Sequence, residues 1–142
     1  MASARRKART LALQAMYEAD TVGHDAGVVL ARLIRETRIS EDAAGFARDL
    51  IAGVAKNKPR IDEYIKTYAR AWPVSQMPAI DRNVLRLAIF EILIDNRIPV
   101  KIGINEAVEL AKAFGGDNSP KFVNGVLGAL VLNVKNDESV EI

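Results

Sequence analysis

The chain contains no cysteine and a single histidine, His24, among its 142 residues. Without cysteine the protein can form no disulfide, no cysteine nucleophile and no thiolate metal site. The same composition suits a reducing compartment, so we expect a cytoplasmic protein. One histidine gives little basis for a histidine-based metal or catalytic centre. We therefore expect no metal, no cofactor and no enzymatic activity.

Long apolar runs are also missing, although hydrophobic residues make up 49% of the chain and the mean hydropathy is +0.03. No stretch of about 18 apolar residues exists, so we expect no transmembrane helix. The basic N-terminus is not followed by an uninterrupted apolar segment, so we expect no secretory signal. The length and the apolar fraction fit one compact domain or two very small ones.

A helical pattern runs through nearly all of the sequence. Ala, Leu, Arg, Lys and Glu dominate, and Gly and Pro stand mainly between the periodic segments. This pattern predicts an all-α protein with about seven helices. Five of them would span residues 3–21, 25–37, 79–94, 104–114 and 120–133. The other two would lie within 39–72, the second of them beginning at Pro59. The 79–94 segment is apolar almost all round, which is typical of a helix buried in the middle of a fold.

The segment "WPVSQMP", residues 72–78, contains two prolines and is the best internal boundary. It predicts that the domain, residues 1–142, consists of two small packed helical bundles. The N-terminal subdomain would span residues 1–72 and the C-terminal subdomain residues 73–142.

The stretch "GGDNSPKFVNGVLG", residues 115–128, resembles a phosphate-binding loop at first sight. A Walker loop needs Gly-x4-Gly-Lys-Ser/Thr after a strand. Here Pro120 replaces the second glycine, Phe122 follows the lysine, and a helix precedes. Lys121 and Phe122 nevertheless share the exposed first turn of a helix, which is a suitable place for a phosphate and a base.

The other residues of this stretch are explained as helix boundaries. We expect Gly115 to end one helix with a positive φ, and Ser119 and Pro120 to begin the next. Gly125 and Gly128 lie three residues apart. They predict a strip without side chains where another helix approaches closely.

Positive charge is concentrated at the N-terminus. The net charge is +2, but four positive side chains lie in residues 1–9, so the remainder sums to −2 (+2 minus 4). On a helical wheel Arg5, Arg6 and Arg9 share one arc with Tyr17, while Lys7 points elsewhere. Clustered arginines favour an anionic partner, and nearby aromatics favour single-stranded nucleic acid over duplex. The alternative is a solvated basic tail.

Three charged residues fall on the otherwise apolar 79–94 segment, namely Asp81, Arg82 and Glu91. Nothing places two carboxylates together in a cleft, as acid–base catalysis would require. The simplest interpretation is an internal or interface ion pair. The alternative is that these residues mark the docking surface of a protein partner.

Three segments together resemble the NusB family of bacterial transcription antitermination factors: "ARRKARTLALQAMYEAD", "AIDRNVLRLAIFEIL" and "INEAVELAKAFGGDNSPKFVNGVLGAL". The resemblance covers nearly the whole chain and is weakest over 22–45. It implies an all-α fold of two helical subdomains without enzymatic activity. It also implies binding to boxA RNA of nascent ribosomal RNA together with NusE, the ribosomal protein S-ten, and assembly of the antitermination complex on RNA polymerase.

The resemblance also assigns residues to these surfaces. The partner surface would include Asp81, Arg82 and Glu91. The RNA-binding residues would be Arg5, Arg6, Lys7, Arg9, Tyr17, Asn118, Lys121 and Phe122. Family members often have an acidic residue in place of Asn118, so we expect tighter RNA binding here and weaker binding on Asn118→Asp.

Two alternatives stay open within the resemblance. Some members form homodimers that hide the RNA surface, so the chain could be a non-catalytic homodimeric interaction module. The same helical module also forms the front part of some ribosomal RNA cytosine methyltransferases, so the chain could be a stand-alone relative of that RNA-binding domain.

Overall fold

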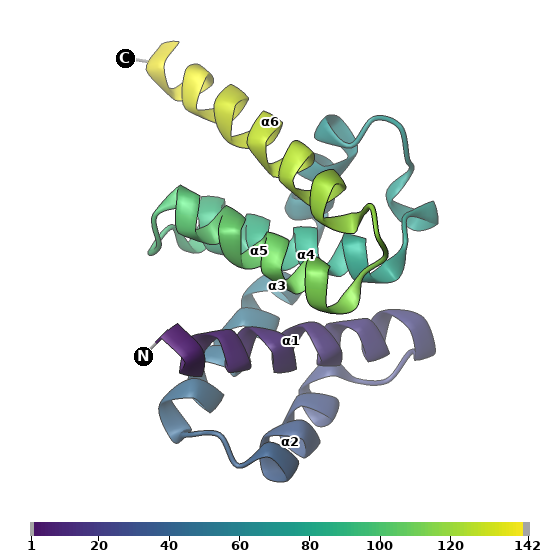
Figure 1. The fold of residues 1–142 in the computed structure, drawn as a ribbon, viewed down its shortest axis with the longest axis vertical. Helices are drawn as coiled ribbons and strands as arrows, with labels where there is room; N and C mark the ends of the chain where they lie inside the picture. The colour runs from purple at the N-terminus through teal and green to yellow at the C-terminus, as the bar shows by residue number, and fades with distance from the viewer. Residues whose placement is uncertain (1, 141–142) are drawn as a thin grey trace. The chain divides into compact units, whose positions relative to one another are not determined.

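The computed structural model describes the backbone of residues 2–140 and the side chains of residues 4–134. Every regular element in this range is helical, which confirms the all-α prediction (Figure 1). None of the described helices is both long enough and apolar enough to span a membrane. The elements, in chain order, are α1 (Ala2–Val22), α2 (Ala26–Thr37), α3 (Glu41–Tyr68), the 3-10 turn η1 (Val74–Gln76), α4 (Ala79–Ile89), the π-helical turn η2 (Phe90–Asp95), α5 (Val100–Phe114) and α6 (Ser119–Val140).

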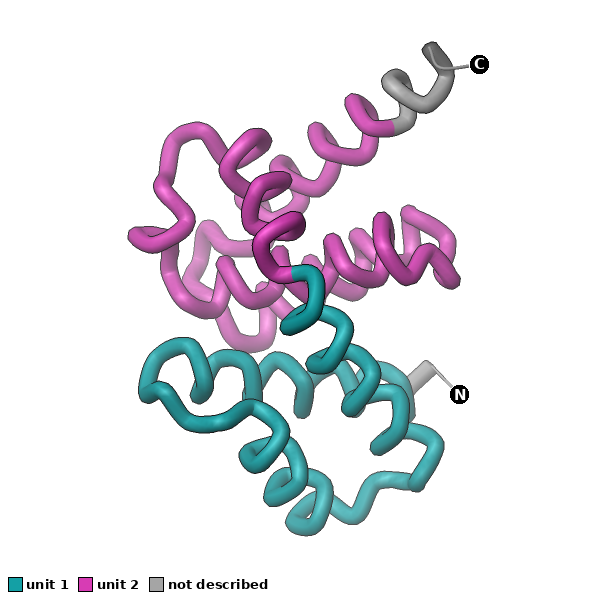
Figure 2. Tube along the Cα trace, turned by 180° about the vertical axis from the view of Figure 1, so that it is seen from behind, with its two compact units in different colours: residues 1–57 teal, residues 58–142 magenta. Residues whose placement is uncertain are grey.

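The chain divides into two compact units, unit 1 with residues 1–57 and unit 2 with residues 58–142 (Figure 2). The proline-rich segment 72–78 predicted a boundary between two subdomains, with residue 72 ending the first and residue 73 beginning the second. In the structure the division falls inside α3 instead, and the second half of that helix belongs to unit 2. Its residue Asp62 forms an ion pair with Arg86 of α4, Oδ1 to Nε 2.8 Å and Oδ2 to Nη2 3.0 Å.

A single helix, α3, occupies the region in which the sequence predicted two. Pro59 lies in its interior and not in a first turn, so that part of the prediction is wrong. A proline inside a helix removes one backbone hydrogen bond. Burial of Ile61 and Ile65, which follow the proline, favours a continuous helix despite this loss. The described residues therefore form six α-helices where the sequence predicted about seven.

Unit 1 is built from α1, α2 and the start of α3. Local signals fix the helix ends: Gly23 follows α1 with a φ of 83°, and the Asp25 carboxylate accepts from the Val28 N–H at 3.0 Å. Ser40 caps α3 by accepting from the Ala43 N–H at 3.1 Å. The core consists mainly of small and aliphatic side chains, which are Ala8, Leu11, Ala15, Val29, Leu30, Ala43 and Ala47.

Unit 2 is organised around α4, which packs against α5 and α6. Eight of its eleven residues are buried, as its all-round apolar pattern predicted. The predicted helix 79–94 is not uniform, because the wider turn η2 replaces the α-helix from Phe90 onward. The turn η2 ends at Asp95, and the next residue, Asn96, has a φ of 56°.

The turn between α5 and α6 differs in detail from the prediction. Gly115 has a φ of −93°, so a positive φ does not explain this glycine. A Cβ at Gly115 would lie 2.5 Å from the hydroxyl oxygen of Ser119. The glycine is therefore required because the Ser119 side chain packs directly against its backbone.

Candidate nucleic-acid interface

Two of the predicted cations in unit 1 lie on one aromatic ring. The guanidinium carbons of Arg5 and Arg9 are 4.2 and 5.2 Å from the ring centroid of Phe46 in α3. Both distances fall within the range of cation–π attraction. Arg5 remains exposed, but Arg9 is only 5% exposed. Arg9 therefore has little surface to offer a phosphate directly, and its visible role is to pack against Phe46.

The other two cations, Arg6 and Lys7, line a groove of about 600 Å³ in unit 1. The helical wheel had grouped Arg6 with Arg5 and Arg9, and had set Lys7 apart. The structure groups the cations differently, because Arg6 and Lys7 are exposed at the same groove. The other residues that line it are Thr10, Leu11, Gln14, Thr37 and Ile39. An anion in this groove would meet two positive charges beside hydroxyl and amide groups.

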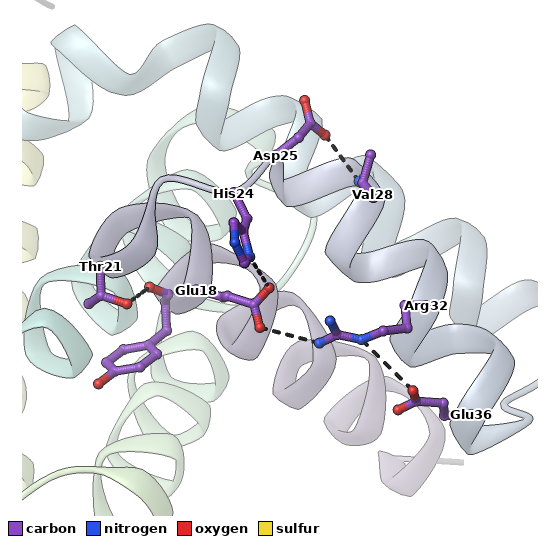
Figure 3. A network of polar contacts seen from close by, with 8 residues as sticks. Glu18, Thr21, His24, Asp25, Val28, Arg32 and Glu36 are labelled. Carbon is purple, nitrogen blue, oxygen red and sulfur yellow. Dashed lines mark hydrogen bonds and ion pairs between the residues drawn. The ribbon is translucent and has the colours of Figure 1, made fainter.

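The C-terminal part of α1 carries Tyr17 and a network of polar contacts (Figure 3). The Tyr17 side chain is 41% exposed. The next residue is Glu18, whose carboxylate contacts His24 Nδ1 at 2.8 Å and Arg32 Nη2 at 3.2 Å. These two hydrogen bonds, first that of His24 and then that of Arg32, hold the pKa of Glu18 below its ordinary value of 4.5. The network links the end of α1 to α2.

The predicted residues of unit 2 gather at an open cleft of about 530 Å³. Asn118, Lys121 and Phe122 all line it, as residues at the start of α6. Asn118 and Lys121 are exposed, and Phe122 is half-buried. The opposite part of the lining comes from the end of α3 and the residues after it, which are Tyr68, Ala69, Arg70 and Ala71. The cleft thus combines two aromatic rings with two cations.

A third aromatic residue supports Phe122. The ring of Trp72 meets that of Phe122 edge-to-face, with centroids 5.6 Å apart and an interplanar angle of 69°. Such pairs contribute about 0.5–1.5 kcal/mol beyond the burial of area. Trp72 is itself 43% exposed. The contact fixes the orientation of the Phe122 ring while both rings remain accessible to a ligand.

The start of α6 is held by a buried carboxylate. The Ser119 hydroxyl donates to Asp81 Oδ1 at 2.6 Å and accepts from the Gly116 N–H at 3.0 Å. Asp81 is only 3% exposed. Asp81 was predicted as a partner contact, but its carboxylate is directed at this internal hydrogen bond. Its visible role is to position the helix start that carries Lys121 and Phe122.

The two other residues predicted for a partner surface also have internal surroundings. The Arg82 Nη1 atom donates to the carbonyl oxygens of Val74 and Met77, each at 3.0 Å. Its side chain is half-buried, so part of it stays accessible. Glu91, in the turn η2, is 4% exposed. Of the three residues, only Arg82 has a side chain that is partly exposed and could contact a partner protein.

Sequence reasoning missed Phe46, Trp72 and Arg70 as members of these sites. Aromatic residues at helical spacing usually belong to a core, and by that pattern Phe46 and Trp72 are assigned to the inward faces of helices. Only the hydrophilic neighbourhood of Trp72, beside Arg70 and a proline, was a local signal against that assignment. No group of three or more potential metal ligands occurs among the described residues.

The fold and these sites define an all-α, two-unit protein with a cationic groove in one unit and a cationic aromatic cleft in the other. Cationic grooves combined with exposed aromatic side chains are typical of a protein that binds a polyanion whose own rings can stack, such as a single-stranded nucleic acid. The NusB family model matches residues 6–131, and the chain belongs to the NusB family.

Individual relatives agree with this assignment. The transcription antitermination protein NusB of Dehalococcoides mccartyi is 54% identical over 130 residues, which cover 92% of this chain and 91% of the relative. The NusB of Roseiflexus sp. is 47% identical over 133 residues, which cover 92% of this chain and 94% of the relative.

Solved structures share the fold as well. The NusB of T. maritima superposes with a TM-score of 0.82 at 36% identity, over 89% of each chain. A chain in a crystal structure of the antitermination factors NusB and NusE in complex with dsRNA has a TM-score of 0.83 at 27% identity. That match covers 92% of this chain and 97% of the other.

Proposed function

We propose that this protein is a transcription antitermination factor that binds boxA-type RNA of nascent ribosomal RNA together with NusE. Membership of the NusB family is the observation that carries the proposal, since the named relatives are antitermination proteins. A structural neighbour that contains NusB, NusE and RNA supports both partners. The protein acts by assembly and not by catalysis, and the assembled pair joins the antitermination complex on RNA polymerase.

The unit 1 surface supplies charge for the RNA backbone. Arg6 and Lys7 are exposed at one groove, and Arg5 is exposed on Phe46. Arginine and lysine side chains bind phosphates through charge-assisted hydrogen bonds. Contacts of this kind give affinity that falls with salt concentration and carry no sequence information. In this proposal Arg9 supports the cluster from its buried position, and Tyr17 offers an exposed ring.

The unit 2 cleft binds bases. Phe122 and Tyr68 offer ring surfaces, while Lys121 and Arg70 offer cations for the adjoining phosphates. Asn118 offers an amide that can both donate and accept a hydrogen bond. Stacking on an aromatic side chain requires a base that is not enclosed in a duplex. We therefore propose a single-stranded ligand, although the RNA in the neighbouring complex is described as dsRNA.

The surface for NusE lies around α4 and its flanks. Arg82 is the proposed contact residue, because its side chain is half exposed at the start of this helix. Asp81 and Glu91 are buried, so we propose that they support this surface from beneath.

An electrophoretic mobility shift with a labelled boxA RNA tests the proposal. The full-length protein is titrated with and without NusE against three RNAs of equal length: boxA, a scrambled single strand and a duplex. We expect the tightest binding to single-stranded boxA with NusE present. Equal binding of boxA and the scrambled strand would contradict base recognition.

The same samples distinguish the alternatives. A stable homodimer in size-exclusion chromatography that fails to bind RNA or NusE would favour a homodimeric interaction module. Binding of all three RNAs with equal affinity, unchanged by the addition of NusE, would favour a stand-alone relative of the methyltransferase RNA-binding domain.

A further inference from the structure

Helix α6 carries two glycines on its exposed side, Gly125 and Gly128. Their spacing had predicted a close approach of another helix, and that prediction is wrong. Apart from the two neighbouring residues and the nearby backbone of α6 itself, a Cβ built at either position meets no heavy atom of the described chain within 4 Å. A glycine inside a helix is destabilising relative to alanine. Packing within the described protein therefore gives no reason for either glycine.

Only one of the two glycines lies at the cleft. Gly125 lines it, one turn after Lys121 and beside Phe122 and Val126. In the described part of the chain, Gly128 does not contribute to this lining. A side chain at position 125 would therefore project into the space that Phe122 and Tyr68 border. A side chain at position 128 would leave that space unchanged.

We propose that Gly125 determines what the unit 2 cleft accepts, by leaving its backbone bare where a nucleotide lies against Phe122. Glycine is the residue that allows a ligand to approach the backbone closely. The ligand class is an unpaired nucleotide of single-stranded RNA, whose base stacks on the ring and whose phosphate meets Lys121. This inference rests on the proposed RNA-binding function and deepens it.

The two glycines provide a matched experiment. Full-length Gly125→Ala, Gly125→Gln, Gly128→Ala and Gly128→Gln are titrated against labelled single-stranded boxA RNA in the presence of NusE, and each is melted thermally. Because alanine and glutamine favour helix over glycine, we expect all four variants to melt at or above the wild-type temperature. We expect Gly125→Gln to weaken RNA binding about tenfold, since a blocked cleft forfeits a stacked base. Gly125→Ala should weaken it less, and the Gly128 variants should bind as the wild type does.

Two further readouts separate a blocked cleft from a lost charge or a damaged fold. Gly125→Gln changes no charge, so the dependence of affinity on salt should keep its wild-type slope. Trp72 is the only tryptophan of the chain and touches Phe122, so its fluorescence reports on whether the Phe122 ring keeps its position. The emission of the free variants should match that of the wild type.

Three outcomes would overturn the inference. If the wild type binds RNA and Gly125→Gln binds it equally tightly, Gly125 has no role in the cleft, while the proposed function stands. If Gly125→Gln and Gly128→Gln weaken binding equally, the exposed side of α6 acts as a whole. If Gly125→Ala lowers the melting temperature and Gly128→Ala raises it, the role of Gly125 is internal. A wild type that binds none of the RNAs would instead remove the proposed function itself.

Discussion

The two units use an aromatic ring for opposite purposes. In unit 1 the ring of Phe46 carries the guanidinium groups of Arg5 and Arg9, so an aromatic residue holds cations in place. In unit 2 the ring of Phe122 is the group presented, and Trp72 and a buried carboxylate hold it in place. The first arrangement presents charge, and the second presents a flat apolar surface beside charge.

This difference separates two contributions to RNA binding. Phosphate contacts release counterions, so their contribution weakens as salt rises. Stacking on a ring is much less sensitive to salt, and it distinguishes an unpaired base from a paired one. If the comparison is correct, variants of unit 1 and unit 2 should differ in the slope of affinity against salt and not merely in affinity.

The largest effect is expected on removing the carboxylate that holds α6. Asp81→Ala would leave the buried Ser119 hydroxyl without its acceptor, and a hydrogen bond to a charged group contributes about 1.5–3 kcal/mol. We expect the free energy of unfolding in urea to fall by about that amount. Asp117→Ala, which removes an exposed carboxylate from the same loop, is the control and should change little.

RNA and partner binding by Asp81→Ala then separate its two roles. As a positioning residue, Asp81 should affect RNA binding through the cleft, and Asp81→Asn should restore part of it because an amide oxygen still accepts from Ser119. Wild-type stability combined with loss of NusE binding would instead mean that Asp81 contacts the partner, as the family resemblance implies.

The next effect concerns the presented ring. Phe122→Ala should weaken the binding of single-stranded boxA RNA by about 1–3 kcal/mol, the range for loss of one stacked base. The salt slope should remain that of the wild type, because no charge changes. Phe114→Ala is a suitable control, since Phe114 is also partly exposed but lies at the end of α5, outside the cleft's described lining. A loss of stability with intact RNA binding would show that Phe122 is only a core residue.

The sequence predicted best what depends on neighbouring residues. The helical class and the buried character of α4 follow from local pattern and spacing, and the structure confirms them. The first turn of one helix grouped Lys121 with Phe122, the family resemblance added Asn118, and all three line one cleft. Whether these residues bind RNA stays a prediction.

Contacts between distant residues account for what the sequence did not predict. Asp81 and Ser119 are 38 residues apart, and nothing in the periodicity of α4 indicates that they meet. The same holds for the ion pair of Asp62 with Arg86. Asp62 lies in the second half of an unbroken α3, and Arg86 lies in α4. Tertiary contacts of this kind outweigh the local preference of Pro59 for a helix start.

A smaller effect on affinity, but a clearer effect on salt dependence, is expected in unit 1. Arg6→Ala should weaken binding to boxA and scrambled RNA alike and lower the salt slope by about one unit. Arg9→Ala should change the slope less, because Arg9 is buried on Phe46. Arg35→Ala, an exposed arginine of α2, is the control for net charge. An unchanged slope in Arg6→Ala would count against a phosphate contact.

The smallest effect concerns the polar network of unit 1 and its dependence on pH. The pKa of Glu18 is lowered in the folded protein, chiefly by the hydrogen bond with His24 and then by that with Arg32. Because the folded-state pKa is lowered, the ionised carboxylate stabilises the fold at pH values above the unfolded-state pKa near 4.5. This contribution is lost as the pH falls from there through the folded-state pKa. The melting temperature of the wild type should therefore fall more steeply below that pH than that of Glu18→Gln. Glu36→Gln, which removes only the longer 3.8 Å contact to Arg32, should behave as the wild type does. Because the network is exposed, the difference should shrink at high salt, whereas the stability loss of Asp81→Ala in unit 2 should not.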